Sequence, residues 1–300
     1  MPIHLNSIPR RSFLAGAAAC AIAPSAYGDE AESETWALLA DTHIDADPAK
    51  VARGVEMAFH LETIVVQLVA ERETLQGVII DGDCAFLAGL PGDYELLAKL
   101  LKPLSEAGLP VHLTMGNHDD RGPCYQAFAK SPGRVTAVES KHVSVMETPL
   151  ANWVLLDSLL VVNKVTGEMG EDQLRWLDQF LQEHSGKPVI LVGHHNPQFA
   201  IREGQRVTGL ADTSQFMSVL AKHPHAQAYL YGHTHHWRTT THESGLHLVN
   251  LPPSAYVFDE KRPNGWVRAE LSKRGMKLTL CALDANHPEH GITKDLGWRG

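Results

Sequence analysis

Histidine, aspartate and asparagine recur in this sequence at the ends of short apolar runs. The stretch "MGNHDD" (115–120) follows the run "PVHLT", and "VGHH" (192–195) follows "PVIL". The same arrangement occurs at five run ends, whose polar residues are Asp41 and His43, Asp83, Asn117 and His118, His194 and His195, and His233 and His235. One histidine after a strand is usually a satisfied surface or core residue, but five such ends in one chain are hard to obtain by chance. The pattern therefore indicates one shared active site.

These candidate ligands are carboxylates, imidazoles and one amide oxygen, with no thiolate among them. Such donors suit borderline or hard ions, such as Zn, Mn or Fe, and disfavour a structural cysteine zinc site. The candidates are too numerous for one ion and suitable for two ions that share a carboxylate. Two ions roughly 3.5–4 Å apart generate hydroxide at neutral pH and stabilise both oxygens of an in-line displacement at phosphorus. The residues thus predict a dimetal hydrolase.

Short, β-rich apolar runs alternate with longer segments of helical spacing. The expected strands lie in the runs at 36–43, 77–83, 111–119, 153–158, 188–195, 228–235 and 246–252. The expected helices lie in 51–73, 93–107 and 170–184. This alternation predicts an α/β layered sandwich, in which functional groups lie in the loops beyond the carboxyl ends of the strands. The last third, from about residue 236, has more strand-like segments and suggests a second sheet.

The composition is that of an ordinary globular protein, with 44% hydrophobic and 20% charged residues. The net charge of −9 argues against a nucleic-acid partner, which would require a basic face. Three widely spaced cysteines, Cys84, Cys124 and Cys281, give no disulfide framework, and we expect at most one pair and more readily none. No repeat or low-complexity linker interrupts the chain, so residues 29–300 are expected to form one domain.

The first 28 residues have the layout of an export signal. "PRRSFLAGAAACAIAPSAYG" (9–28) contains paired arginines, then an apolar stretch too short to span a bilayer, then small residues. "RRSFL" resembles a twin-arginine signal, whose cargo crosses the membrane folded. We expect cleavage after Gly28, with lipidation at Cys20 as the weaker alternative. The expected location is periplasmic or secreted, reached through the twin-arginine machinery and without a stable membrane anchor.

The polar motifs at the five run ends follow one another in the same order as the motifs of the calcineurin-like metallophosphoesterases, which this chain resembles. The matching motifs are Asp41-x-His43, Gly82-Asp83, Gly116-Asn117-His118-Asp119, Gly193-His194-His195 and Gly232-His233-x-His235. The likeness is greatest to the small members that act on cyclic nucleotides or glycerophosphodiesters. It implies the α/β/β/α sandwich of that family, with mixed sheets flanked by helices. It also implies a small phosphate ester as the substrate.

The resemblance implies a role for each matching residue. Asp41, His43 and His235 would hold the first ion, and Asn117, His194 and His233 the second. Asp83 would bridge them together with a hydroxide, the nucleophile. His118 would donate a proton to the leaving oxygen or stabilise the charged transition state, and Asp119 would orient His118.

Three positions near these motifs are less determined. His195 is next to His194, the preferred ligand. We expect His195 to contact either the ligands of the second ion or the substrate. Arg121 either reaches a substrate phosphate or is a solvated loop residue. The family often has Asp or Asn three residues after the bridging aspartate, whereas this chain has Phe86. That departure removes a hydrogen-bonding partner behind the metals but leaves metal binding possible.

The leading prediction is an exported dimetal phosphoesterase that hydrolyses a phosphodiester or phosphomonoester by attack of a metal-bridging hydroxide. Two alternatives stay open. The same site could serve a metallohydrolase acting on a bond other than a phosphate ester. A non-catalytic scaffold with this fold is the other, although scaffolds of this kind lose ligands that this chain keeps. The metals' identity, the oligomeric state and the substrate are not determined by the sequence.

Overall fold

The computed structural model describes residues 33–128, 137–201 and 203–299. The predicted export signal at 1–28 lies outside these residues. Within them, no helix is both long and apolar enough to cross a membrane.

The first sheet carries three of the predicted site loops. Its strands lie in the order β14 (Thr293–Gly297), β13 (Gly275–Ala282), β12 (Gly265–Ser272), β1 (Glu34–Ala40), β4 (Leu75–Asp81) and β5 (Val111–Leu113). β1, β4 and β5 are parallel, so their carboxyl ends meet at one edge, whereas β12, β13 and β14 are antiparallel additions. The loops that follow β1, β4 and β5 therefore come together.

The second sheet carries the other two site loops. Its strands lie in the order β10 (Arg238–Thr241), β11 (His247–Asn250), β9 (Ala226–Tyr231), β8 (Val189–Val192), β7 (Asn152–Leu155) and β6 (Ser144–Glu147). β7, β8, β9 and β11 are mutually parallel, and the outer strands β6 and β10 are antiparallel to their neighbours. A second sheet is present, as suggested from the last third of the chain, but the strands after residue 236 do not form it by themselves. These strands instead extend both sheets, because β10 and β11 join β9 while β12 joins β1.

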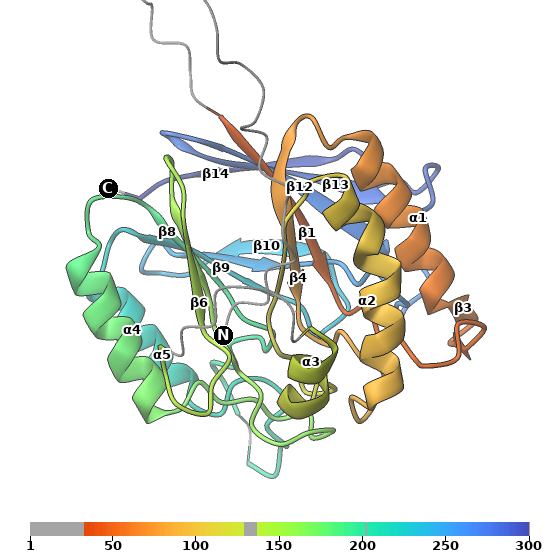
Figure 1. The fold of residues 1–300 in the computed structure, drawn as a ribbon. Helices are drawn as coiled ribbons and strands as arrows, with labels where there is room; N and C mark the ends of the chain where they lie inside the picture. Colours follow the sequence, from red (N-terminus) through yellow and green to blue (C-terminus); the bar gives the residue numbers. More distant parts are fainter. Residues whose placement is uncertain (1–32, 129–136, 202, 300) are drawn as a thin grey trace, which may run out of the picture.

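Helices cover the outer face of each sheet, as Figure 1 shows: α1 (Met57–Ala70) and α2 (Pro91–Glu106) lie on one side of the molecule, and α4 (Glu171–Glu183) and α5 (Thr213–Ala221) on the other. The short α3 (Arg121–Ala127) follows the β5 loop. Adjacent β1 residues show the layering, because Leu39 packs in the cluster under α1 and α2 while Leu38 packs between the sheets. Strands buried on both faces read as continuous apolar runs. The predicted α/β/β/α sandwich is confirmed.

The helix expected over 51–73 begins later than predicted. Residues 51–56 form a tight hairpin of β2 (Val51–Ala52) and β3 (Val55–Glu56), and α1 follows directly. The two turn residues, Arg53 and Gly54, have φ of 50° and 80°, the signature of the two-residue turns that match the twist of paired strands. The apolar positions in this stretch also fit helical spacing, so periodicity alone could not separate the two structures.

Candidate metal centre

The five polar strand ends converge on one buried region between the two sheets. Direct contacts join the loops across the sheets: His194 Nδ1 lies 3.0 Å from the Asp81 carbonyl oxygen, and the backbone nitrogen of His233 lies 3.1 Å from Asp41 Oδ2. Within the first sheet, the backbone nitrogen of His43 donates to the Asp83 carbonyl at 2.9 Å. The parallel strands therefore deliver their loops to one place, as the sequence predicted.

Asp41, His43 and His235 form the first cluster of potential ligands, and their ligand atoms all lie within 4.8 Å of one another. His235 Nε2 is 3.1 Å from His43 Nε2 and 3.4 Å from Asp41 Oδ1. All three residues are buried. These are the residues that the resemblance assigned to the first ion.

A second cluster within the same limit contains Asp83, His194 and His233. His194 Nε2 lies 3.2 Å from Asp83 Oδ2, and that same oxygen is 3.9 Å from His43 Nε2 in the first cluster. Asp83 thus faces both clusters, which is the place a bridging carboxylate requires. Asn117 is buried beside this group, with 3% of its surface exposed.

Three of the histidines are fixed in one tautomer by backbone carbonyls. His194 Nδ1 donates to the Asp81 carbonyl at 3.0 Å and His235 Nδ1 to the Tyr256 carbonyl at 2.6 Å. His233 Nε2 donates to the Thr208 carbonyl at 2.7 Å. Because a carbonyl only accepts, each bonded nitrogen carries the proton, and the other nitrogen keeps a lone pair. Metal-ligating histidines are oriented in this way.

Several buried polar atoms in these clusters have no hydrogen-bond partner, which tests whether the residues fit a metal. They are Asn117 Oδ1, His194 Nε2, which lies 3.2 Å from Asp83 Oδ2, and His43 Nδ1. The last does not bear on a metal, because the ring nitrogen of His43 that faces His235 and Asp41 is Nε2. Leaving a buried acceptor unsatisfied costs about 1–3 kcal/mol. A cation satisfies lone pairs on an amide oxygen and an imidazole nitrogen that no protein donor reaches. The donor set of imidazole and carboxylate suits the borderline ions predicted from the sequence, so the residues fit a two-metal centre.

The backbone at the centre is strained where the ligands stand. Five of the seven predicted ligands have left-handed φ angles, namely Asp41 (52°), His43 (47°), Asp83 (44°), His233 (67°) and His235 (51°). Non-glycine residues adopt this region at a cost of order 1–3 kcal/mol each, and such residues concentrate at functional sites. The fold therefore holds these side chains in place against a local conformational preference.

Glycines at the centre are required for close approach rather than for an unusual turn. A Cβ on Gly116 would lie 2.2 Å from Asp83 Oδ1, and one on Gly232 would lie 2.6 Å from Asp41 Oδ2. Neither position is among those with left-handed φ. The absent side chain of Gly116 therefore makes room for the Asp83 carboxylate.

Burial sets the charge state of the centre. It lowers the pKa of His233 to about 3 and that of His235 to about 4, and it also lowers the pKa of His43. Burial acts to raise the pKa of Asp83, but the adjacent His194 overcomes this and holds it well below its usual range. Burial acts to lower the pKa of His194, but Asp83 in turn raises it well above its usual value, so this pair carries a proton in the metal-free centre that a bound cation would displace. Neutral imidazoles at His43, His233 and His235 and an ionised Asp83 are already in the protonation states that bind a cation.

His118 lies at the edge of the first cluster and is oriented by a backbone carbonyl. Its Nδ1 donates to the Leu87 carbonyl at 2.7 Å, and its backbone nitrogen donates to Asp83 Oδ1 at 2.8 Å. Its ring is 5.4 Å from the ring of His43, between centroids. Nε2 is thus the nitrogen left for proton transfer. Leu87 itself has a φ of 53°, so the residue that holds His118 is also strained.

Asp119 does not orient His118, and that prediction is wrong. Its two carboxylate oxygens accept hydrogen bonds from the backbone nitrogens of Cys84, Ala85 and Gly116 and from the Tyr94 hydroxyl, at 2.8–3.2 Å. Burial raises the pKa of Asp119 to about 6. Asp119 instead ties the loop that carries Asp83 to the loop that carries Asn117 and His118.

Arg121 is neither a solvated loop residue nor aimed at the centre. Its Nε and Nη2 form two hydrogen bonds with Asp157, at 2.7 and 2.9 Å, and Nη2 also reaches the Leu159 carbonyl. This pair fixes the start of α3 to the loop after β7. Because both nitrogens are committed, the geometry disfavours their use as a phosphate clamp.

His195 lies behind His194 and is fully buried. Its Nδ1 pairs with the Ser158 hydroxyl at 2.7 Å, and its ring is 4.6 Å from that of His233, between centroids. Nε2 has no partner, and a Cβ on Gly167 would overlap the ring. It therefore supports the rings of the second cluster, and a substrate contact stays a prediction.

Core packing is the ordinary expectation for aromatic residues in an apolar stretch, and two of them, Tyr256 and Phe258, lie beside the centre. Tyr256 is 9% exposed and stacks on His43, with centroids 5.0 Å apart and planes at 18°. Phe258 is 56% exposed, and its ring is 4.4 Å from that of His235. The expectation is therefore right for Tyr256 and wrong for Phe258. Phe86, the departure from the family pattern, packs against the small cluster of Met57, Ala255 and Tyr256.

The three described cysteines, Cys84, Cys124 and Cys281, are all free thiols.

Comparisons with known proteins agree with this geometry. Residues 35–237 match the calcineurin-like phosphoesterase family. A probable cyclic nucleotide phosphodiesterase of Synechococcus is 28% identical over 253 residues, which cover 83% of this chain and 92% of the relative. The 3′,5′-cyclic adenosine monophosphate phosphodiesterase CpdA of Pseudomonas aeruginosa is 26% identical over 66% of this chain and 68% of its own length.

Solved structures show the same fold at low sequence identity. A dimetal phosphatase from Danio rerio superposes with a TM-score of 0.67 at 18% identity, covering 88% of this chain and 99% of that one. The purple acid phosphatase PPD1 of yellow lupin gives a TM-score of 0.66 at 12% identity, with 90% and 55% covered. With a family match across most of the described residues and a buried two-metal donor set, this chain belongs to the calcineurin-like phosphoesterases and is a metal-dependent phosphoester hydrolase.

Proposed function

We propose that this protein hydrolyses a phosphodiester bond of a cyclic nucleotide. The observation that carries the proposal is the pair of adjacent ligand clusters, in which Asp83 of the second lies 3.9 Å from His43 of the first and His118 groups with both residues. Two relatives named as cyclic nucleotide phosphodiesterases support the choice of substrate class.

Each cluster would hold one ion. Asp41, His43 and His235 would hold the first, Asn117, His194 and His233 the second, with Asp83 shared between them. When bound, two ions supply an activated water and neutralise the phosphate oxygens. The chain's own contribution is to fix these donors, since carbonyls orient the imidazoles and the loop contacts hold the carboxylates.

His118 would protonate the leaving ester oxygen. Its Nδ1 is held by the Leu87 carbonyl, so Nε2 is the nitrogen that can give and take the proton. A positioned general acid contributes typically 10²–10⁴-fold to the rate. Since Arg121 is engaged by Asp157, His118, which groups with His43 and Asp83, is the residue that this chain offers for the proton transfer.

The test measures hydrolysis by wild-type protein and by His118→Ala on three substrates: 3′,5′-cyclic AMP, an acyclic phosphodiester and a phosphomonoester. We expect the wild type to cleave the cyclic nucleotide, and the variant to lose about 10²–10⁴-fold in kcat while it keeps its metals. His247→Ala is the control, because His247 lies on β11 and bonds to the Gly297 carbonyl. Equal rates for wild type and His118→Ala, or no hydrolysis of the cyclic nucleotide by the wild type, would contradict the proposal.

We also propose that the protein is exported and that residues 29–300 act as one phosphoesterase domain. The twin-arginine-like sequence at residues 9–14 supports the proposal. Arg10→Lys together with Arg11→Lys should trap the protein inside the cell, as fractionation and immunoblotting would show. An unchanged distribution would argue against this route.

A further inference from the structure

The β2–β3 hairpin places one arginine beside the metal centre without a carboxylate partner. Arg53 is exposed and stands at the turn with a φ of 50°. Its guanidinium carbon lies 4.6 Å from the centroid of the Phe258 ring and 5.9 Å from that of Tyr256. No acidic side chain within the described residues forms an ion pair with it. Its recorded contacts are with aromatic rings, so the guanidinium keeps donors available to a ligand.

The two rings connect Arg53 to the predicted ligands. Phe258 lies against His235, with centroids 4.4 Å apart, and Tyr256 lies against both His43 and His235, at 5.0 and 4.9 Å. The guanidinium, the two aromatic rings and the ligand imidazoles therefore form a continuous group that runs from the surface into the centre. A substrate whose phosphate sits at the metals would place its remaining part near this group.

Exposure shows which members of the group can meet a substrate. Phe258 is 56% exposed, whereas Tyr256 is 9% exposed and serves as packing. Leu87, whose carbonyl holds His118, is 48% exposed and adds an apolar side chain on the His118 side of the centre. A single exposed apolar residue is ordinary on a protein surface. Here two of them and an unpaired guanidinium border the same buried donor set.

We infer that Arg53 and Phe258 form a binding subsite for the base of a nucleotide, the part of the substrate beyond the phosphate. Guanidinium groups and aromatic rings both stack on the faces of planar rings. A phosphate held at the predicted ligands would gain nothing from the exposed ring of Phe258, whereas a planar base could stack on this group. This inference rests on the proposed function, because it names what selects the substrate at that same site.

The test uses two ligands that differ only in the base, adenosine 5′-monophosphate and ribose 5-phosphate. Their dissociation constants would be measured on metal-loaded protein by calorimetry. We expect the wild type to bind the nucleotide at least about fivefold more tightly, the smallest gain that one stacked base gives. Arg53→Ala and Phe258→Ala should bring the ratio toward one and leave the affinity for ribose 5-phosphate unchanged. Phe258→Tyr, which keeps the ring, should preserve the ratio.

Two exposed residues of the same types serve as controls. Arg72 lies beyond the end of α1, beside Glu73, and Phe59 lies on α1 and is 60% exposed. The control variants are Arg72→Ala and Phe59→Ala. Neither should change the ratio. A wild-type ratio near one would overturn the inference, as would equal weakening of both ligands by Arg53→Ala and Phe258→Ala. Failure of the wild type to hydrolyse a cyclic nucleotide would count against the proposed function, whereas the binding ratio judges the subsite by itself.

Discussion

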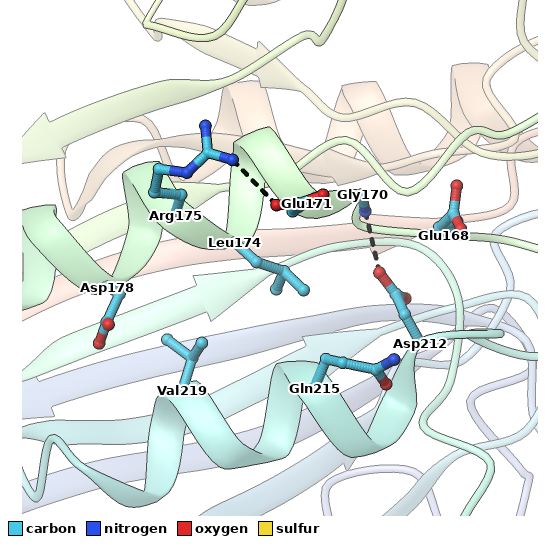
Figure 2. Close-up of a pocket in the computed structure, with 9 residues that line it drawn as sticks. All are labelled: Glu168, Gly170, Glu171, Leu174, Arg175, Asp178, Asp212, Gln215 and Val219. Carbon is cyan, nitrogen blue, oxygen red and sulfur yellow. Dashed lines mark hydrogen bonds and ion pairs between the residues drawn. The ribbon is translucent and has the colours of Figure 1, made fainter.

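The molecule has two regions rich in acidic side chains, and only one of them has the properties of a metal site. The metal centre lies between the sheets, while a cleft of about 550 Å³ lies between α4 and α5 (Figure 2). Glu168, Glu171, Asp178 and Asp212 line this cleft. In their acidic side chains the two regions look alike, although histidines are found in the metal centre and not in the lining of the cleft.

Their hydrogen bonds separate them. In the cleft, Asp212 accepts from the backbone nitrogens of Met169 and Gly170, and Glu171 pairs with Arg175, as Figure 2 shows for two of these contacts. Asp178 pairs with Lys222 and His223. In the metal centre, by contrast, Asn117 Oδ1 is buried without a partner, and His194 Nε2 has the Asp83 carboxylate beside it at 3.2 Å.

Their backbones differ as well. In the cleft, left-handed φ falls on a glycine, Gly170 at 81°, where it costs little. In the metal centre it falls on the ligands themselves. Buried ligand atoms without a hydrogen-bond partner and a strained backbone at the ligand residues therefore distinguish the metal centre from the cleft. A concentration of acidic residues does not. The following predictions test this contrast, from the largest expected effect to the smallest.

Replacing the shared carboxylate should have the largest effect. Asp83→Ala removes the one side chain that faces both clusters, and we expect at least about 10³-fold loss of kcat/KM together with loss of bound metal. Steady-state kinetics would measure kcat/KM, and elemental analysis would measure the bound metal. Activity within tenfold of wild type would show that Asp83 is not shared between the ions.

Filling the space at Gly116 should disturb the same carboxylate without removing it. Gly116→Ala would place a Cβ 2.2 Å from Asp83 Oδ1 and 2.3 Å from its backbone nitrogen. We expect a loss of about 1–3 kcal/mol or more in the free energy of unfolding, with reduced activity. Gly186→Ala is the matched control, because its Cβ would meet nothing within 4 Å. Equal urea midpoints for the two variants would refute the close-approach explanation.

Acidification should destabilise the metal-free protein. The pKa values of His142 and His233, about 3, and of His235, about 4, lie below the ordinary 6.5, so the native state binds fewer protons than the unfolded state between these values. Stability contributed by these groups is lost as the pH falls from 6.5 toward 4. Asp41, Asp81, Asp119 and His194 have raised pKa values and act in the opposite direction. They are outnumbered by buried groups whose pKa values are lowered, which also include His43, His195 and Asp83.

Urea denaturation in the presence of a chelator, at several pH values, would measure this dependence. We expect the free energy of unfolding to fall steadily between pH 6.5 and 4. Rising stability over that range would mean that the aspartates, rather than the histidines, dominate the titration of the metal-free centre.

The smallest effect is expected in the cleft. Asp178→Asn breaks exposed pairs with Lys222 and His223, and such pairs contribute about 0.2–1 kcal/mol. We expect unchanged metal content and activity, with a stability change within about 1 kcal/mol. Loss of bound metal in this variant would show that the cleft also takes part in metal binding.

The sequence predicted the positions of the ligands better than the contacts that support them. Asp41, Asp83 and His194 each follow an apolar run, and parallel strands bring such ends together whatever the details of packing. The role of Asp119 was missed because its partners are mostly backbone nitrogens, which carry no sequence signal. The Leu87 carbonyl that orients His118 was missed for the same reason.

The subsite residues were missed for a different reason. Arg53 sits in a two-residue turn whose apolar neighbours also fit helical spacing, so no turn was predicted there. Phe258 lies in an apolar stretch, where packing was the natural expectation. Only the tertiary arrangement shows that this ring is exposed beside His235.

The most direct test of the metal centre is the number of ions bound per chain in wild-type protein and in His194→Ala. His194 belongs to the second cluster and has the buried Nε2 without a partner. Elemental analysis of protein saturated with Mn or Zn and then freed of excess metal should give two ions per chain for the wild type and one for the variant. A wild type that binds one ion or none, or a variant that still holds two, would contradict the two-cluster centre.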